Sequence, residues 1–311
     1  MADRRGREAF VSFSSKADAI QPLFYARAGA YGDRMSKQTK VWMITGASAG
    51  FGQALAEEVI ARGERVVVAA RTAAALEALV ARAPDRVLAV RMDVTRGDDI
   101  TAGVAAARAR FGDIDVLINN AGYSMVGAVE ETSEAELRTL METMFFGPVA
   151  LTREVLPRMR ERKAGTIVQI TSVAALGTAA GFGPYCAAKH ALEGLSECLA
   201  KEVAPLGIRV LLVEPGAFRT SLFGAAFRAM PPLDAYADSV GPTRAFAETS
   251  AGKQPGDPRK AAIAIADAVD AGVPTLRLPL GTDAVTMIRG KLAEVAADVS
   301  ANERVATAQD F

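Results

Sequence analysis

The sequence is poor in the residues that build metal centres and covalent cross-links. Its 311 residues include one histidine, His190, and two cysteines, Cys186 and Cys198, all within one predicted helix. No spacing typical of metal ligands appears, and about 18 Å of helix separates the two thiols, beyond disulfide reach. We therefore expect no metal site and no disulfide, and the free thiols favour a reducing compartment, the cytoplasm.

An excess of one charge is also lacking. Lys+Arg and Asp+Glu number 36 each, so the formal net charge is zero. Nucleic-acid binding usually shows as a basic excess, so nucleic acid is not an expected partner. No uninterrupted apolar run reaches the length of a membrane span. Aromatic residues make up only 6% while half of all residues are apolar, which suits Ala/Val/Leu helices packed on a sheet.

Short apolar runs alternate with helical segments from Lys40 onward, as in parallel α/β proteins. The predicted strands are 41–45, 65–70, 86–92, 114–118, 166–171, 208–213 and 275–278. The predicted helices are 53–62, 73–82, 98–111, one opened by the capping box at Ser133, 149–162, 184–203, 258–271 and 284–297. The alternation predicts an α/β fold: a Rossmann-type doubly wound parallel sheet of about seven strands with helices on both faces.

Three segments depart from this alternation. Residues 1–36 are expected to form an N-terminal arm, either a flexible or start-site extension or an arm that packs on a neighbouring subunit. The single domain is expected over 37–299, followed by a tail at 300–311. Within the domain, 217–256 is rich in Phe, Ala, Pro and Gly and is predicted to form a mobile lid over the substrate.

A glycine-rich turn follows the first predicted strand. Thr45-Gly-Ala-Ser-Ala-Gly-Phe-Gly52 carries Gly46, Ser48, Gly50, Phe51 and Gly52 at the start of a helix. Glycines let a backbone turn tightly and approach a pyrophosphate at the free N–H groups of a helix N-terminus. A simple tight turn is the alternative, but the position after strand one of an α/β pattern favours dinucleotide binding.

The end of the second predicted strand indicates which dinucleotide is bound. An acidic residue there would bind the ribose 2′-hydroxyl of NAD, but the strand ends Ala69-Ala70-Arg71. A guanidinium pairs well with a 2′-phosphate, so Arg71 predicts a preference for NADP(H) over NAD(H). The alternative is that Arg71 is only a solvated surface charge.

Tyr185 and Lys189 lie four residues apart in a predicted helix, and Ser172 ends a preceding β-branched run. Side chains at i and i+4 share one helix face, so the phenol and the ammonium can point into one site. A cation about 4 Å from a phenol can lower its pKa by roughly three units at an effective dielectric near 20. Hydroxyl, phenol and ammonium together suit carbonyl reduction beside a hydride donor.

These motifs, with Asn119-Asn120-Ala121-Gly122 and Pro215-Gly216, resemble the short-chain dehydrogenase/reductase family in order and approximate spacing over roughly 40–280. The stretch 185–220 resembles the branch of 17β-hydroxysteroid and retinol dehydrogenases and related bacterial oxidoreductases. The resemblance implies that Tyr185 is the general acid or base, that Ser172 holds the substrate oxygen, and that Lys189 binds the nicotinamide ribose and lowers the tyrosine pKa. The further cofactor contacts that it implies are Asp93, Val94, Asn119, Ala121, Gly122, Pro215, Gly216 and Thr220.

One position departs from the family pattern. Met144 stands where members usually carry an asparagine that holds a water linking the lysine to solvent, and a thioether is a poor substitute. The proton path then uses another group, or the enzyme is slow, or the chain binds cofactor without turnover.

The resemblance also implies a homodimer or homotetramer through helices near 135–160 and 184–204. Together these patterns predict an NADP(H)-dependent oxidoreductase that interconverts a lipophilic secondary alcohol and a ketone or aldehyde. The rival hypothesis is a cofactor-binding regulator or scaffold without turnover. A sugar epimerase of the extended branch is disfavoured by the glycine spacing and by the short region after strand six.

Overall fold

The computed structural model describes residues 39–272 and 275–309. The predicted arm at 1–36 lies outside these residues. No helix among the described residues is long and apolar enough to cross a membrane.

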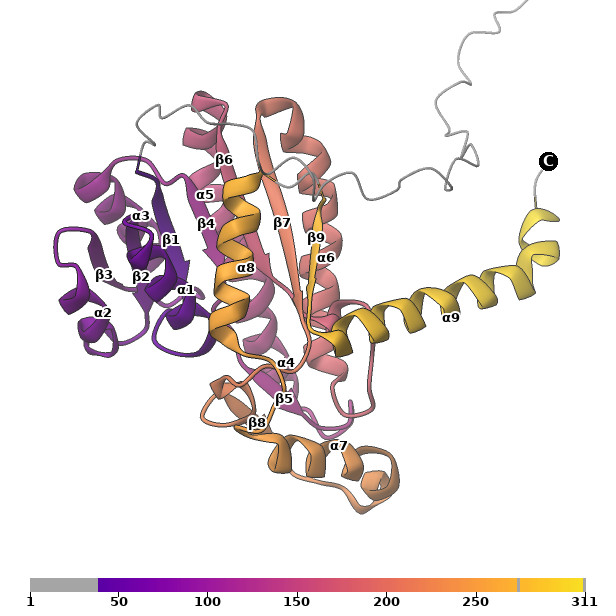
Figure 1. The fold of residues 1–311 in the computed structure, drawn as a ribbon. Coiled ribbons are helices and arrows are strands. Elements are labelled where there is room, and N and C mark those ends of the chain that lie inside the picture. Colours follow the sequence, from indigo (N-terminus) through magenta and orange to yellow (C-terminus); the bar gives the residue numbers. More distant parts are fainter. Residues whose placement is uncertain (1–38, 273–274, 310–311) are drawn as a thin grey trace, which may run out of the picture. The chain divides into compact units, whose positions relative to one another are not determined.

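The described residues form a parallel sheet of seven strands in the order β3-β2-β1-β4-β6-β7-β9 (Figure 1). The strands are β1 (Val41–Thr45), β2 (Arg65–Ala70), β3 (Val87–Arg91), β4 (Val116–Asn119), β6 (Gly165–Ile170), β7 (Ile208–Pro215) and β9 (Arg277–Leu280). Each is β-branched or apolar along most of its length, as strands buried on both faces require. The doubly wound parallel sheet predicted from the sequence is confirmed.

Two apolar cores cover the two faces of the sheet. Side chains alternate along each strand, so Trp42 and Ile44 join one core and Val41 and Met43 the other. The first core packs against α1 (Gly50–Ala61), α2 (Glu77–Arg82) and α8 (Pro258–Ala271). The second packs against α3 (Gly97–Phe111), α5 (Gly147–Arg162) and α6 (Gly183–Val203).

Several helix boundaries follow from local chemistry. The Ser133 hydroxyl accepts from the Glu136 N–H and begins α4 (Glu134–Met141), as the capping box predicts. Asp257 caps α8 in the same way. Helix α1 begins three residues earlier than predicted because Gly50 and its neighbours form its first turn.

The predicted lid contains regular structure that the sequence pattern did not reveal. Residues 217–256 include β8 (Phe227–Ala229), which pairs with β5 (Ser124–Val126), and α7 (Ala237–Ser250). Arg244 of α7 pairs with the carboxylate of Glu131 and donates to the carbonyl of Met230 at 2.7 Å. The segment is therefore attached to the loop after β5 through specific polar contacts.

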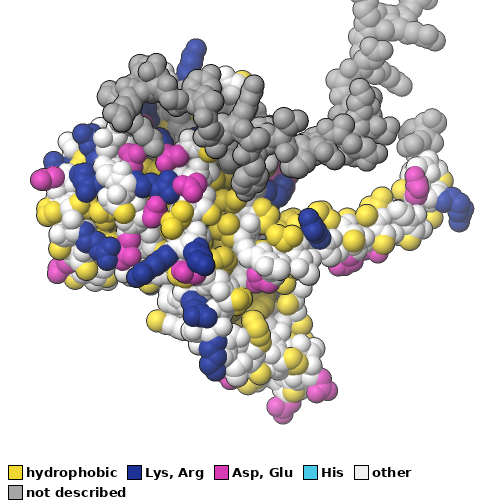
Figure 2. Space-filling model, in the orientation of Figure 1, with side chains coloured by type: hydrophobic (Ala, Val, Ile, Leu, Met, Phe, Trp, Pro, Cys, Tyr) yellow, Lys and Arg dark blue, Asp and Glu magenta, His cyan; other side chains and the backbone are white. Residues whose placement is uncertain are grey.

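The final helix is longer than predicted. Helix α9 spans Thr282–Thr307, ten residues beyond the expected end at Ala297, because no Gly or Pro interrupts that stretch. Its side chains are exposed from Leu292 onward, and Figure 2 shows hydrophobic side chains along it. On the same face of the domain, acidic and basic side chains are interspersed (Figure 2).

Candidate active site

A cavity of about 840 Å³ lies at the carboxyl ends of the central strands. Strand order reverses between β1 and β4, so the loops that follow these two strands run in opposite directions and leave a crevice. The loops after β1, β4, β6 and β7 all contribute lining residues. Ligands of open α/β sheets bind in this position.

The glycine-rich turn forms one wall of the cavity. Gly46 and Gly50 have φ values of 65° and 58°, a region that residues with a Cβ rarely adopt. Gly50 is also the first residue of α1, whose first turn contains no acidic side chain. The free N–H groups at this helix start therefore suit an anion such as a pyrophosphate.

Thr45 and Asn120 hold this turn in place across the crevice. The Thr45 hydroxyl accepts hydrogen bonds from the backbone N–H groups of Asn120 at 3.0 Å and Ala121 at 3.1 Å. The Asn120 amide donates in turn to the carbonyls of Thr45 at 2.9 Å and Gly46 at 3.2 Å. The motif Asn-Asn-Ala-Gly indicated this loop, but the sequence did not reveal that its second asparagine fixes the glycine turn.

Two residues predicted as cofactor contacts do not line the cavity. Asn119 is buried at the end of β4, and its amide donates to Thr152 at 3.2 Å and to the carbonyl of Pro148. Alternation along the strand turns its side chain toward α5, so Asn120 rather than Asn119 lines the cavity. Gly52 lies behind the turn, where a Cβ would meet the Gly46 carbonyl oxygen at 2.4 Å. Gly52 is therefore closely packed against the turn.

The adenosine end of the crevice is bounded by β2 and β3. Arg71 follows β2, is exposed, and lines the cavity together with Asp93 and Val94. One oxygen of Asp93 accepts from the backbone N–H of Thr95 at 3.0 Å and from its hydroxyl at 2.7 Å. That carboxylate is thereby oriented at the cavity wall.

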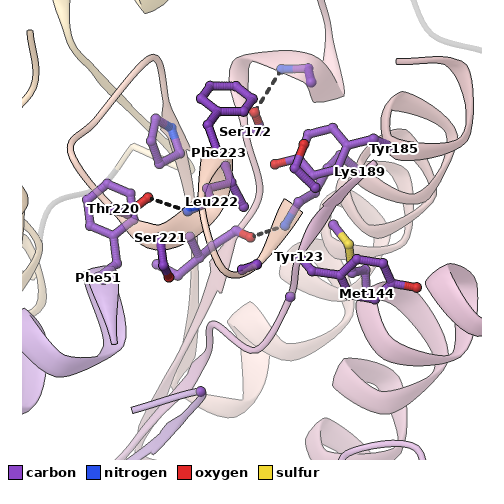
Figure 3. A pocket seen from close by; sticks show the side chains of 18 of the residues that line it. Phe51, Tyr123, Met144, Ser172, Tyr185, Lys189, Thr220, Ser221, Leu222 and Phe223 are labelled. Atoms are coloured by element: carbon purple, nitrogen blue, oxygen red, sulfur yellow. Dashed lines mark hydrogen bonds between the residues drawn. The ribbon is translucent and has the colours of Figure 1, made fainter. Parts of the chain in front are cut away.

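Ser172, Tyr185 and Lys189 meet at the opposite end of the same cavity (Figure 3). Ser172 follows β6, and its hydroxyl accepts from the backbone N–H of Ala174 at 3.1 Å. Tyr185 lies in the first turn of α6 and hydrogen-bonds the Ser172 hydroxyl. Lys189 follows one turn later on the same face and lines the cavity, as the spacing predicts.

The expected lowering of the Tyr185 pKa does not occur in this arrangement. Burial raises the pKa of Tyr185 to about 12, and the hydrogen bond from Ser172 opposes this only in part. The Lys189 ammonium lies 5.8 Å from the ring centroid and donates to the Ile170 carbonyl at 2.8 Å. Tyr185 is therefore a protonated phenol at neutral pH.

The pKa of Lys189 is also shifted by its surroundings. The residue is buried, and this desolvation lowers its pKa to about 8, while the charge of Glu193 acts in the opposite direction. Because a neutral lysine would lose its attraction for a phenolate, groups that keep Lys189 charged affect the chemistry of the whole site.

Met144 lies in a π-helical turn, Glu142–Phe146, between α4 and α5. Turns of this kind are often found at functional sites. Its side chain is buried with Met125, Leu140 and Tyr185, and it also lines the cavity. Met144 therefore presents an apolar side chain beside Tyr185 (Figure 3).

Aromatic and aliphatic side chains enclose the space beside Ser172 and Tyr185. Phe51 packs on Phe218 with ring centroids 5.0 Å apart, and Phe223 contacts Phe182 and Phe246 at 6.3 and 6.0 Å. All five of these rings line the cavity. This part of the cavity wall is therefore apolar.

Helix α9 contributes two further lining residues that no sequence signal indicated. Asp283 accepts from the backbone N–H of Ala217 at 2.7 Å, and Met287 packs against Gly177. These contacts arise because β9 delivers the chain to the edge of the loop that follows β7.

Apart from Asn119 and Gly52, every predicted site residue lines this one cavity. From the turn after β1 to the loop after β7, these residues are Gly46, Ser48, Gly50, Phe51, Arg71, Asp93, Val94, Ala121, Gly122, Ser172, Tyr185, Lys189, Pro215, Gly216 and Thr220. Thr220 also leans on the glycine turn, where a Cβ at Gly50 would lie 3.1 Å from the Thr220 Cβ.

Comparison with known proteins places this arrangement in context. The family model described as short chain dehydrogenase matches residues 40–230. The oxidoreductase BOA17 of Botryotinia fuckeliana is 38% identical over 261 residues, which are 83% of this chain and 94% of that protein.

Solved structures are similar over most of the chain. The structure of a short-chain dehydrogenase from Streptomyces avermitilis is 52% identical and covers 89% of this chain and 100% of its own, with a TM-score of 0.84. A short-chain dehydrogenase/reductase from Burkholderia phymatum, solved in complex with NAD, is 25% identical with a TM-score of 0.75. It covers 84% of this chain and 95% of its own.

Proposed function

This chain belongs to the short-chain dehydrogenase family of NAD(P)-dependent oxidoreductases, which act on CH–OH groups, and from that premise we propose that it reduces a lipophilic ketone or aldehyde with NADPH. The observation that carries the proposal is the convergence of Ser172, Tyr185 and Lys189 in one cavity with the glycine-rich turn.

The cavity fits a dinucleotide. Gly46 and Gly50 supply the positive φ angles of the turn at the start of α1, and the N–H groups there suit a pyrophosphate. Asp93 and Val94 would border the adenine, and Lys189 the nicotinamide ribose. A bound nicotinamide supplies the hydride, which is the chemistry that the protein side chains lack.

The protein's own part of the reaction is proton transfer and orientation. Ser172 would hold the substrate oxygen, and Tyr185 would donate its phenolic proton to that oxygen as the carbonyl carbon is reduced. A pKa of about 12 keeps Tyr185 protonated at neutral pH, which suits a general acid and therefore the reductive direction. Lys189 would stabilise the phenolate that remains.

Preference for NADPH is supported by Arg71. Its guanidinium lines the cavity directly after β2, where an NAD-specific site would carry an acidic side chain. A fork of N–H donors binds a 2′-phosphate through charge-assisted hydrogen bonds.

A lipophilic substrate is supported by the rings of Phe182, Phe223 and Phe246 beside the catalytic hydroxyls. We further propose that the protein acts in the cytoplasm as a homodimer or homotetramer, in keeping with its free thiols and with the family resemblance.

The rival proposal is a cofactor-binding regulator without turnover, which Met144 favours because its thioether cannot hold a relay water as an asparagine does. The two are separated by following NADPH oxidation at 340 nm, the absorbance of the reduced nicotinamide, with a panel of hydrophobic ketones. NADPH binding detected by calorimetry without turnover of any ketone would favour the regulator. Turnover that Tyr185→Phe leaves intact would overturn the proposed mechanism.

A further inference from the structure

Two buried carboxylates lie between α6 and β7, and the one on α6 follows Lys189 by one helical turn. Glu193 of α6 and Glu214 of β7 are 3% and 0% exposed. Val213 belongs to the core on the α1 and α8 face, so alternation turns the next residue, Glu214, toward α6. Register pairs Val213 with Ile170, whose carbonyl accepts from Lys189. Glu214 and the carbonyl that accepts from Lys189 therefore lie at the ends of the neighbouring strands β7 and β6.

Among the described residues, one guanidinium forms ion pairs with both carboxylates. Arg277 of β9 lies 3.0 Å from a Glu193 oxygen and 2.9 Å from a Glu214 oxygen, and it also pairs with the half-exposed Glu197. The charged groups that face the pair from the elements packed around it are Lys189 and Glu197 on α6 and Arg277 on β9. Three carboxylates thus share one guanidinium.

The oxygens of the pair lack hydrogen-bond donors. All four carboxylate oxygens of Glu193 and Glu214 are buried without a hydrogen bond among the described residues, since the Arg277 contacts are close but poorly aligned. Two ionised carboxylates are acceptors only and cannot bond each other. Leaving such oxygens buried and unsatisfied is costly, whereas one proton between the carboxylates turns one of them into a donor.

We propose that Glu193 and Glu214 share one proton, and that the single negative charge left on this acid pair keeps Lys189 protonated. Burial and the neighbouring Glu193 raise the pKa of Glu214 to about 8, in keeping with a proton held by the pair at neutral pH. Glu193 lies four residues from Lys189 on the same helix face, and its charge opposes the desolvation of the ammonium.

The acid pair contains positioning residues and not catalytic ones, because it acts through Lys189. This inference rests on the proposed reduction, in which the phenolate of Tyr185 needs a charged lysine. It also gives the protein a means of holding that charge beside Met144, which offers no proton donor.

Carboxyl and side-chain ¹³C NMR tests the inference without turnover. Protein labelled at the Glu Cδ and Lys Cε carbons is titrated from pH 5 to 10, with Glu193→Gln, Glu214→Gln and Lys189→Arg assigning the signals. We expect one carboxyl of the pair to stay protonated at pH 7. We also expect Glu193→Gln to lower the Lys189 midpoint by about one unit, the order of effect of losing one nearby charge at an effective dielectric near 20.

Glu197→Gln is the matched control, because it removes a carboxylate from the same arginine at the helix surface. Glu197→Gln should leave the Lys189 midpoint unchanged. If Glu193→Gln folds poorly, Glu193→Asp, which keeps the carboxylate, should give the wild-type Lys189 midpoint. Ionisation of both carboxyls below pH 6, or an equal shift in Glu197→Gln, would overturn the inference.

The pH profile of kcat supplies the enzymatic readout. In Glu193→Gln the alkaline limb of the kcat profile for ketone reduction should shift to lower pH together with the Lys189 midpoint. In Glu197→Gln this limb should not shift. A wild-type protein without turnover would refute the proposed function, and the NMR titrations would still decide whether the acid pair exists and controls Lys189.

Discussion

Lys189 donates a 2.8 Å hydrogen bond to the carbonyl oxygen of Ile170, the last residue of β6. This contact ties the ammonium to the centre of the sheet and not to the tyrosine hydroxyl. Because Ser172 lies two residues beyond Ile170, the same strand end also sets the position of the Ser172 hydroxyl. The register of β6 and the start of α6 thus together define the geometry of Ser172, Tyr185 and Lys189.

Replacing Tyr185 with phenylalanine should abolish ketone reduction while leaving cofactor binding intact. Loss of a general acid typically lowers a rate by about 10²- to 10⁴-fold, and the ring itself, which packs in an apolar cluster, is retained. Single-turnover kinetics with NADPH and calorimetric titration of the same variant measure the two effects. A variant that loses NADPH affinity and rate in equal measure would show that Tyr185 serves mainly in binding.

Arg71→Ala should weaken NADPH much more than NADH. A charge-assisted hydrogen bond contributes about 1.5–3 kcal/mol, so the KM for NADPH should rise by roughly 10- to 100-fold while that for NADH changes less than about twofold. Arg91→Ala is the matched control, because Arg91 ends the neighbouring strand β3 but pairs with Asp99. Equal changes for both cofactors would contradict the preference for NADPH.

Gly52→Ala should disrupt the nucleotide-binding turn although Gly52 does not line the cavity. Its new Cβ would lie 2.4 Å from the Gly46 carbonyl oxygen and 2.5 Å from the Asn120 amide. Such overpacking costs about 1–3 kcal/mol, so both the unfolding midpoint and NADPH affinity should fall. Gly194→Ala, in the middle of α6 with open space around it, should instead stabilise the protein by about 0.5–1 kcal/mol.

Those residues show how far the sequence alone could lead. The glycine turn and the Tyr185–Lys189 pair are local motifs, because their spacing fixes their geometry within one turn or one helix. Asn119 was predicted to line the cavity, but Asn120 does so, since alternation at the end of β4 decides which side chain faces the crevice. The contact of Glu193 with Glu214 depends on how α6 lies on β7, which no local pattern encodes.

Stability should depend on pH through Glu214. Its folded pKa, about 8, is raised above the ordinary value of 4.5, so the folded protein holds an extra proton between these values. The free energy of unfolding supplied by this group is therefore fully present below about pH 4.5 and is lost as pH rises through 8. Urea unfolding at pH 6, 7 and 8 should show this decline in wild type, and Glu214→Gln should remove much of it. A slope that survives in Glu214→Gln would assign the effect to other groups.

Met144→Asn should lower stability without raising the rate. Met144 is buried among Met125, Leu140 and Met230, where an amide would lose its hydrogen bonds to water. An unsatisfied buried amide costs about 1–3 kcal/mol, whereas the volume-conserving change Met144→Leu should cost less than about 1.5 kcal/mol. Thermal unfolding and kcat for ketone reduction are measured on both variants. If the acid pair of Glu193 and Glu214 keeps Lys189 charged, an asparagine at this position adds nothing to turnover. A several-fold gain in kcat for Met144→Asn alone would instead mean that the natural chain has an impaired proton path.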